Sequence, residues 1–288
     1  MSPLAIAIVV AGTLLPVGLR AGSAPPQSST LLLRDRRGSA SDLEISEAAG
    51  ATRFVAYEDL LKLPLVTYTV SDDSNFGPET QVSGVPLGQL ARAAGAKPDL
   101  VVAICNDKYR AHYTSEYIAA HRPLLVLKVN GRTAADWPKS HDGGSMGPYL
   151  ISHPPFTPSF HILSHTDEPQ IPYGVVRVEF RSQLQVLGAI RPPGAYPPQS
   201  AVWQGYRIAQ QNCLRCHNLG AVGGQMARHP WTVLAAWAAS DPEYFVHYVR
   251  NPRAAGAGRM MPAMTSYDDR TLEALRAYFA TFAARPRP

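Results

Sequence analysis

Cysteine is scarce in this chain, and its distribution excludes several kinds of site. The 288 residues contain three cysteines, and none of them precedes Cys105. Cys213 and Cys216 form a single Cys-x-x-Cys pair, so a zinc ribbon, which needs a second pair, is excluded. A thioredoxin-like redox site is disfavoured as well, because the pair lies outside any βαβ pattern.

Long apolar runs are also scarce. The longest, Leu4 to Leu15, is short for a membrane span. With the small residues and the Pro25-Pro26 pair that follow it, this run predicts a signal peptide over residues 1–24, although the usual preceding basic residues are missing. We expect a periplasmic protein with at most peripheral membrane association; an uncleaved N-terminal anchor is the alternative.

Lysine is absent after Ser200, yet this part carries the excess positive charge. Ten arginines and five acidic residues lie there, which accounts for the formal net charge of +5. The arginines form either a solubilising surface or a docking face for an acidic redox partner protein. A nucleic-acid partner is not expected, since no basic motif with interleaved aromatics is present.

A proline-rich linker over residues 191–199 divides the chain, because its prolines remove backbone donors and break regular structure. Before it, residues 42–190 alternate short apolar runs with turn residues, which predicts a mostly-β domain and an α+β chain. Strands are expected at Leu65–Val70, Leu100–Ile104, Leu124–Val129 and Val175–Phe180. Short helices are expected at Ala56–Lys62 and Leu87–Ala94.

After the linker the apolar period lengthens to about 3.6 residues, which predicts an all-α domain over residues 200–288. Helices are expected at Trp203–Asn212 and at Pro242–Arg250, the second with Asp241 as its N-cap. Ser266 and Asp269 resemble a capping box that starts the last helix. Its apolar face contains Leu272, Leu275, Phe279 and Phe282.

The segment Cys213-Leu-Arg-Cys216-His217 follows the Cys-x-x-Cys-His pattern of covalent haem attachment. In this pattern two thiols bond to the porphyrin and the adjacent imidazole ligates the iron. The motif therefore predicts one haem c, attached to Cys213 and Cys216, with His217 as an axial ligand of the iron.

Residues 200–288 resemble a small class I c-type cytochrome. The resemblance rests on Gly205-Tyr206, the haem motif, Asn251-Pro252, Met261-Pro262 and Tyr278-Phe279. It implies that the sixth iron ligand is a methionine from the loop before the last helix. Because the family ligand commonly precedes proline, Met261 ranks first, followed by Met264 and then Met260. His229 and His247 are not expected to replace the methionine.

The N-terminal part resembles the molybdopterin-binding domain of the sulfite oxidase family. The resemblance rests on the order of Gly84–Leu87, Val101–Tyr109, Leu124–Gly131 and His141–Gly144. In that family a cysteine before the first of these elements binds molybdenum, and an arginine near residues 147–149 helps to hold the pterin. This chain has neither residue at those positions, so we do not expect bound molybdopterin.

Cys105 allows three interpretations. A buried thiol that acts as a small hydrophobe is favoured. The alternatives are a metal site shared with His112, Asp107 or His141, and an intermolecular disulfide.

Four histidines lie in or near a proline-rich stretch: His141, His153, His161 and His165. Their spacing matches no fixed ligand pattern, so ordinary exposed loop positions are expected. A shallow pocket lined by some of them is the alternative.

Together these features predict a periplasmic monohaem c-type cytochrome that transfers single electrons, with the N-terminal domain as a non-catalytic docking module. Whether the chain also catalyses a reaction by itself is open. One alternative is a sulfite-dehydrogenase-like molybdohaem oxidoreductase. The other is a haem-based redox sensor or assembly factor.

Overall fold

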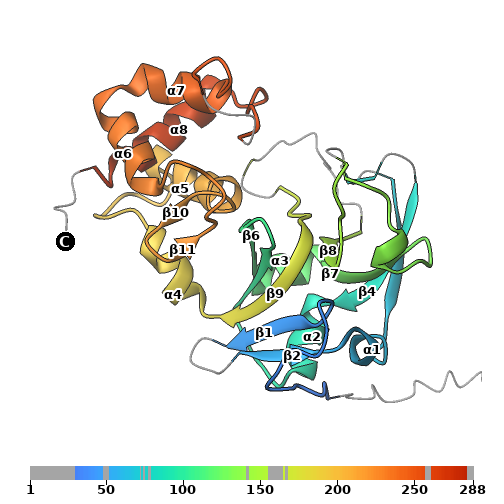
Figure 1. Ribbon diagram of the computed structural model, residues 1–288. Coiled ribbons are helices and arrows are strands. Elements are labelled where there is room, and N and C mark those ends of the chain that lie inside the picture. The colour runs from blue at the N-terminus through green and yellow to red at the C-terminus, as the bar shows by residue number, and fades with distance from the viewer. Residues whose placement is uncertain are drawn as a thin grey trace, which may run out of the picture.

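The computed structural model describes residues 30–47, 52–71, 73, 75–76, 79–140, 143–154, 165, 168–256 and 261–283. The expected signal peptide, His141, His161 and Met260 lie outside these ranges. Within them the fold is mixed α+β: a curled sheet forms the N-terminal part and helices gather toward the C-terminus (Figure 1). None of the helices in these ranges is long and apolar enough to cross a membrane.

The N-terminal part is built on one curled sheet. Its strands are β1 (Leu43–Glu47), β2 (Arg53–Val55), β3 (Val66–Val70), β4 (Thr80–Pro86), β5 (Leu100–Cys105), β6 (Arg110–Thr114), β7 (Leu124–Val129), β8 (Tyr149–Ser152) and β9 (Tyr173–Arg181). Short helices lie between them: α1 (Tyr57–Leu60), α2 (Leu87–Ala93), α3 (Ser115–His121) and the 3-10 helix η1 (Ala134–Asp136).

Strand β9 is the centre of this sheet. It pairs in parallel with β1 and antiparallel with β8 and β5. The path continues from β8 through β7 and β4 to β3, while β5 also pairs with β6. The β5–β6 hairpin therefore extends from β9 toward the helical part of the chain (Figure 1).

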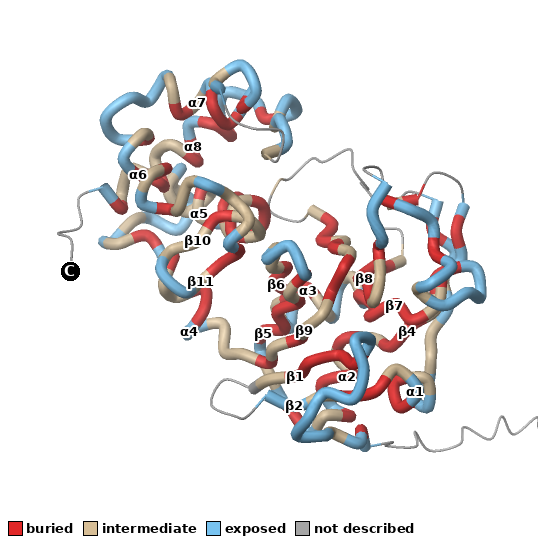
Figure 2. The backbone as a smooth tube through the Cα atoms, in the orientation of Figure 1, coloured by how far each residue is buried: buried red, intermediate tan, exposed pale blue. Residues whose placement is uncertain are grey.

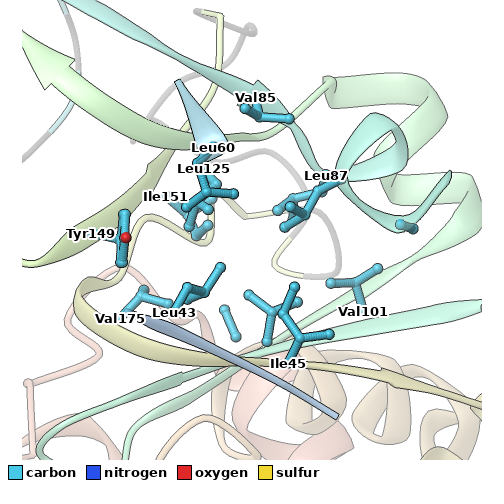
Figure 3. Close-up of a cluster of buried hydrophobic side chains, with 14 of the residues drawn as sticks. Leu43, Ile45, Leu60, Val85, Leu87, Val101, Leu125, Tyr149, Ile151 and Val175 are labelled. Atoms are coloured by element: carbon cyan, nitrogen blue, oxygen red, sulfur yellow. The ribbon is translucent and has the colours of Figure 1, made fainter. Parts of the chain in front are cut away.

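The curled sheet encloses an apolar core. Leu43 and Ile45 of β1 face Leu125 and Ile151 across the core, and Val175 of the neighbouring β9 lies beside Leu43 (Figure 3). All five side chains are buried, because alternate residues of each strand point to the inner face of the sheet. The same alternation leaves other residues of β5 free to pack outside this core.

Helices form the C-terminal part. After α4 (Gln183–Leu187) and the 3-10 helix η2 (Gly188–Ile190), the chain continues through α5 (Ala201–Asn212), the short hairpin β10 (Asn218–Leu219) and β11 (Val222–Gly223), then α6 (Trp231–Ser240), α7 (Pro242–Arg250) and α8 (Asp269–Ala280). The structure thus confirms the helices that the sequence predicts at Trp203–Asn212 and at Pro242–Arg250.

Helices α5 and α8 pack at very close range. A Cβ atom on Gly205 of α5 would overlap the backbone carbonyl of Ala274 in α8, which explains why glycine occupies this position. Tyr278 of α8 is completely buried beside the same contact, and its ring lies 5.9 Å from that of Tyr206.

The start of α8 and the end of α1 differ from the sequence expectation. The N-cap of α8 is Asp268, which accepts a 2.8 Å hydrogen bond from Thr271 N, so the capping box expected at Ser266 is wrong. A carboxylate three residues before a free N–H caps a helix as well as a serine hydroxyl does. The sequence contains both candidate N-caps, Ser266 and Asp268. Helix α1 ends at Leu60 because Lys62 and Leu63 form tighter i→i−3 bonds ahead of Pro64.

The two parts of the chain share a second core. Leu100 and Val102 of β5 point away from the sheet interior and pack in the same buried cluster as Ile208 and Leu275 of the helical part. Buried positions therefore occur in both parts and between them (Figure 2). Because this cluster is continuous, the helical part lies directly on the sheet.

The proline-rich segment packs against the start of α5. Trp203 Nε1 donates a 3.0 Å hydrogen bond to Tyr196 O, and the Arg191 guanidinium lies 5.2 Å from the centre of the Trp203 ring. The expected domain boundary at this segment stays a prediction.

Candidate haem-binding site

A cavity of about 780 Å³ lies between the helical part and the sheet. This volume falls within the roughly 300–1,000 Å³ usual for ligand sites. Cys213, Cys216 and His217 line it from the turn after α5, and Met261 and Met264 line it from the loop before α8. The structure therefore brings together the sequence-predicted site residues that it describes.

The turn after α5 presents the three motif side chains to one cavity. Cys216 N and His217 N both bond to Cys213 O, at 3.2 and 2.9 Å, which winds the motif tightly. The hairpin behind it is held by Gly224 N, which donates to Leu214 O at 2.9 Å. A side chain on Gly224 would collide with the Arg215 carbonyl, so the motif and the hairpin are in close contact.

The His217 imidazole has the orientation and charge of an iron ligand. Its Nδ1 lies 2.6 Å from the backbone oxygen of His229, and a carbonyl can only accept, so Nδ1 carries the proton. Burial lowers the pKa of His217, which keeps the ring neutral. The remaining nitrogen, Nε2, is therefore free to ligate a metal.

Both motif cysteines are protonated thiols in this setting. Burial raises the pKa of Cys213 to about 12 and that of Cys216 to about 11, while Arg215 acts in the opposite direction. Met226 Sδ lies 3.7 Å from Cys216 Sγ and fills space beside the thiol.

Met261 and Met264 are both half-buried and both line the cavity. Because both thioethers line the same cavity as His217, the expected order of Met261 before Met264 stays a prediction. His247 is exposed, as expected for a residue on a helix surface. His229 also lines the cavity, and its carbonyl orients His217, a role that the sequence did not indicate.

One buried hydroxyl close to the motif has no partner in the described part of the chain. The Tyr267 hydroxyl has no hydrogen-bond partner among the described residues. Burial raises the pKa of Tyr267, with Glu168 and Cys213 adding to the shift, which places the hydroxyl near the motif. The paired thiols, the free imidazole nitrogen and the two thioethers that line the cavity together fit a covalently attached iron porphyrin.

The opposite wall of the cavity comes from the N-terminal part. Cys105, Asp107, Tyr109 and Tyr173 line the same space as the haem motif. Cys105 is 3 % exposed, which confirms the expected buried thiol, and burial raises its pKa. Within the described ranges, no three His, Cys, Asp or Glu side chains are grouped to hold a metal ion. The metal-site alternative for Cys105 includes His141, which lies outside these ranges, so it stays a prediction.

Two residues of the N-terminal part bear on the question of molybdopterin binding. Tyr149, near the position where the family would supply a basic contact, is completely buried, and its hydroxyl donates a 2.7 Å hydrogen bond to Ser41 O. Cys105, the single cysteine of this part, faces the haem-motif cavity. Neither residue supplies the basic or thiolate contact that the sulfite oxidase family uses to hold the cofactor, and the expectation of no bound molybdopterin stays a prediction.

Two of the loop histidines are not ordinary exposed residues. His153 is 7 % exposed, and its Nε2 lies 3.3 Å from the Tyr117 hydroxyl. His165 Nδ1 lies 2.9 Å from a Glu168 carboxylate oxygen, and its ring packs against Tyr267 at 4.2 Å. The expectation of exposed positions was therefore wrong for both, because tertiary contacts from distant segments cover them.

Arg215 also departs from expectation. As one of the ten C-terminal arginines it was assigned to the surface, but its side chain is 17 % exposed. It donates to Gln211 O and Asn212 Oδ1, both at 2.6 Å, and its charge acts to lower the pKa of Tyr109 against the effect of burial. Its guanidinium lies 3.8 Å from the Glu168 carboxylate.

The helical part of the chain is a c-type cytochrome domain. Residues 200–279 match the family described as cytochrome C oxidase, cbb3-type, subunit III. Such a domain implies haem c and electron transfer. The comparison with curated proteins gave no match.

A partial likeness exists to the crystal structure of the sulfane dehydrogenase SoxCD from Paracoccus pantotrophus. The sequence identity is 17 %, the TM-score is 0.33, and the aligned region covers 49 % of this chain and 38 % of that one. The present chain thus spans well under half of the matched chain, and we base no functional assignment on this likeness.

Proposed function

We propose that this chain is a periplasmic monohaem cytochrome that carries single electrons, with haem c attached to Cys213 and Cys216 and ligated by His217 and Met261. The observation that carries the proposal is the His217 Nδ1 contact with the His229 carbonyl, which leaves Nε2 free in a cavity lined by both thiols and two methionines. When bound, the haem supplies an iron centre that gains or loses one electron.

The residues of the chain prepare this site in three ways. The His229 carbonyl fixes the tautomer and ring direction of His217. The tight turn after α5 holds both thiols on the side of the imidazole. The wall formed by Cys105, Tyr109 and Tyr173 excludes water from one side of the cavity, which favours the reduced, less charged state of the iron.

The N-terminal part acts as a non-catalytic docking module in this proposal. Its contacts with the haem motif support a structural role, and the arginine excess of residues 200–288 favours an acidic redox partner. The signal-like N-terminal sequence supports export.

The axial ligand is tested by replacing Met261 and Met264 with alanine, one at a time. The Met261→Ala protein should lose the sulfur-to-iron charge-transfer band at the red end of the oxidised spectrum, because that band needs a thioether bound to ferric iron. The Met264→Ala protein, as the matched control, should keep it. A band that survives Met261→Ala and disappears in Met264→Ala would assign the ligand to Met264.

The attachment is tested with Cys216→Ala. Losing one thiol should leave a single bond to the porphyrin and shift the α-band of the reduced pyridine complex to longer wavelength, since one vinyl group stays unsaturated. An unchanged spectrum would contradict the assignment of the motif.

A further inference from the structure

The guanidinium of Arg215 lies inside the haem motif but is held by residues from the other part of the chain. Arg215 lies between Cys213 and Cys216 in sequence, and it lines the cavity with both of them. Glu168, just before β9, faces the guanidinium at 3.8 Å, and Tyr109, in the β5–β6 turn, lines the same cavity. Both partners precede the proline-rich segment.

Backbone hydrogen bonds fix the β5–β6 turn against the haem motif. Arg110 N donates to Arg215 O at 2.9 Å, and Gln225 N donates to Lys108 O at 3.1 Å. One bond is made by the motif and the other by the chain just after the β10–β11 hairpin. The turn therefore cannot move away from Arg215 without breaking main-chain contacts with the cytochrome domain.

The charge of Arg215 acts on the iron because its side chain is largely shielded from water. Two charges in a medium of low dielectric constant interact more strongly than two charges in water. Ferric haem carries one more positive charge than ferrous haem, so an uncompensated cation beside it stabilises the reduced state. The carboxylate of Glu168 offsets that cation. Removing either member of the pair changes the net charge beside the haem.

We propose that Glu168, Tyr109 and Arg215 form an interdomain clamp that sets the reduction potential of the haem, with Glu168 compensating the charge of Arg215. This inference rests on the proposed function, since it requires a haem at Cys213 and Cys216. Glu168 and Arg215 are positioning residues here, because they act on the iron through charge and not as ligands. The N-terminal part then controls an electronic property of the cytochrome domain and is more than a passive cover.

Potentiometric titration of the full-length holoprotein tests the clamp. Glu168→Gln should raise the midpoint potential, because Arg215 is left uncompensated. Arg215→Gln should lower it, and the double variant should return toward the wild-type value. Arg215→Lys, which keeps the charge, should stay closer to wild type than Arg215→Gln.

The matched control is the exposed pair Arg250 and Asp269, whose side chains are 44 % and 95 % accessible. Arg250→Gln and Asp269→Asn should produce smaller shifts than the clamp variants, and added salt should reduce them, since exposed charges are screened.

The outcomes separate the two proposals. Absence of covalent haem in the wild-type protein would contradict the proposed function. Haem attached normally, with a Glu168→Gln potential that is unchanged or lowered, would overturn the clamp. If Arg215→Gln does not accumulate as holoprotein, the direction in which Glu168→Gln shifts the midpoint potential still tests the clamp. A control shift equal to that of Glu168→Gln would also overturn the clamp.

Discussion

At the scale of single residues, the haem motif could be predicted because the residues that attach the haem and ligate its iron are contiguous in sequence. Cys213, Cys216 and His217 are neighbours, so five letters of sequence specify both attachment and ligation. The clamp could not be predicted from the sequence, because the tertiary fold brings Arg215 close to Tyr109 and Glu168. The sequence shows a charged residue within the Cys-x-x-Cys-His motif, but it does not indicate which residues contact that charge.

Buried His112 predicts a measurable pH dependence of stability. Burial, with a contribution from Arg110, lowers the pKa of His112 to about 3, and its Nδ1 has no partner among the described residues. Between about pH 6.5 and pH 3 the unfolded chain therefore binds a proton that the folded chain does not. The free energy of unfolding must fall as the pH falls, by up to about 1.4 kcal/mol per pH unit from this residue.

Urea unfolding at pH 6.5 and pH 5 measures this effect. Wild-type protein should lose up to about 2 kcal/mol more than His112→Gln over that interval, because glutamine does not titrate. His247→Gln, at an exposed position, should behave like wild type. Equal losses in wild type and His112→Gln would show that His112 does not titrate as its burial requires.

At the scale of elements, the sequence was informative where local signals agreed. The N-cap Asp241 with Pro242 located α7, and its side chain accepts a 3.0 Å hydrogen bond from Tyr244 N. Apolar runs located β3, β5, β7 and β9. By contrast, β6 was missed because it is short and contains no apolar run: its polar residues Arg110, His112 and Thr114 alternate with Ala111 and Tyr113.

Close packing of α5 on α8 predicts a large cost for a small substitution. Gly205→Ala would place a methyl group on the Ala274 carbonyl, so we expect a loss of about 1–3 kcal/mol in the free energy of unfolding. Gly88→Ala in α2 is the matched control, since its nearest neighbour would lie at an ordinary 3.5 Å. That control should be neutral or stabilising by up to about 1 kcal/mol. Equal effects in thermal denaturation would contradict the packing of these helices.

At the scale of the whole molecule, the sequence divided the chain into two parts but did not predict how tightly they join. The proline-rich segment and the change of period are local signals, whereas the shared core depends on which face of β5 points outward. Leu100 and Val102 look like ordinary strand residues in sequence.

Because both parts of the chain contribute to this second core, we expect them to unfold together. Leu100→Ala should lower the free energy of unfolding measured by haem absorbance by about 2–5 kcal/mol, although Leu100 lies in the sheet. Leu184→Ala, at a position 75 % exposed, should leave it nearly unchanged. A haem transition unaffected by Leu100→Ala, with a shifted far-ultraviolet circular dichroism transition, would show independent units.

The proposed function requires a monohaem electron carrier whose N-terminal part holds no redox cofactor of its own. Metal content by mass spectrometry, measured on protein purified from its native cells with iron as the internal standard, tests this requirement. One iron per chain and no molybdenum is the predicted result. Stoichiometric molybdenum would contradict the account and identify an enzyme that binds its cofactor without the usual cysteine.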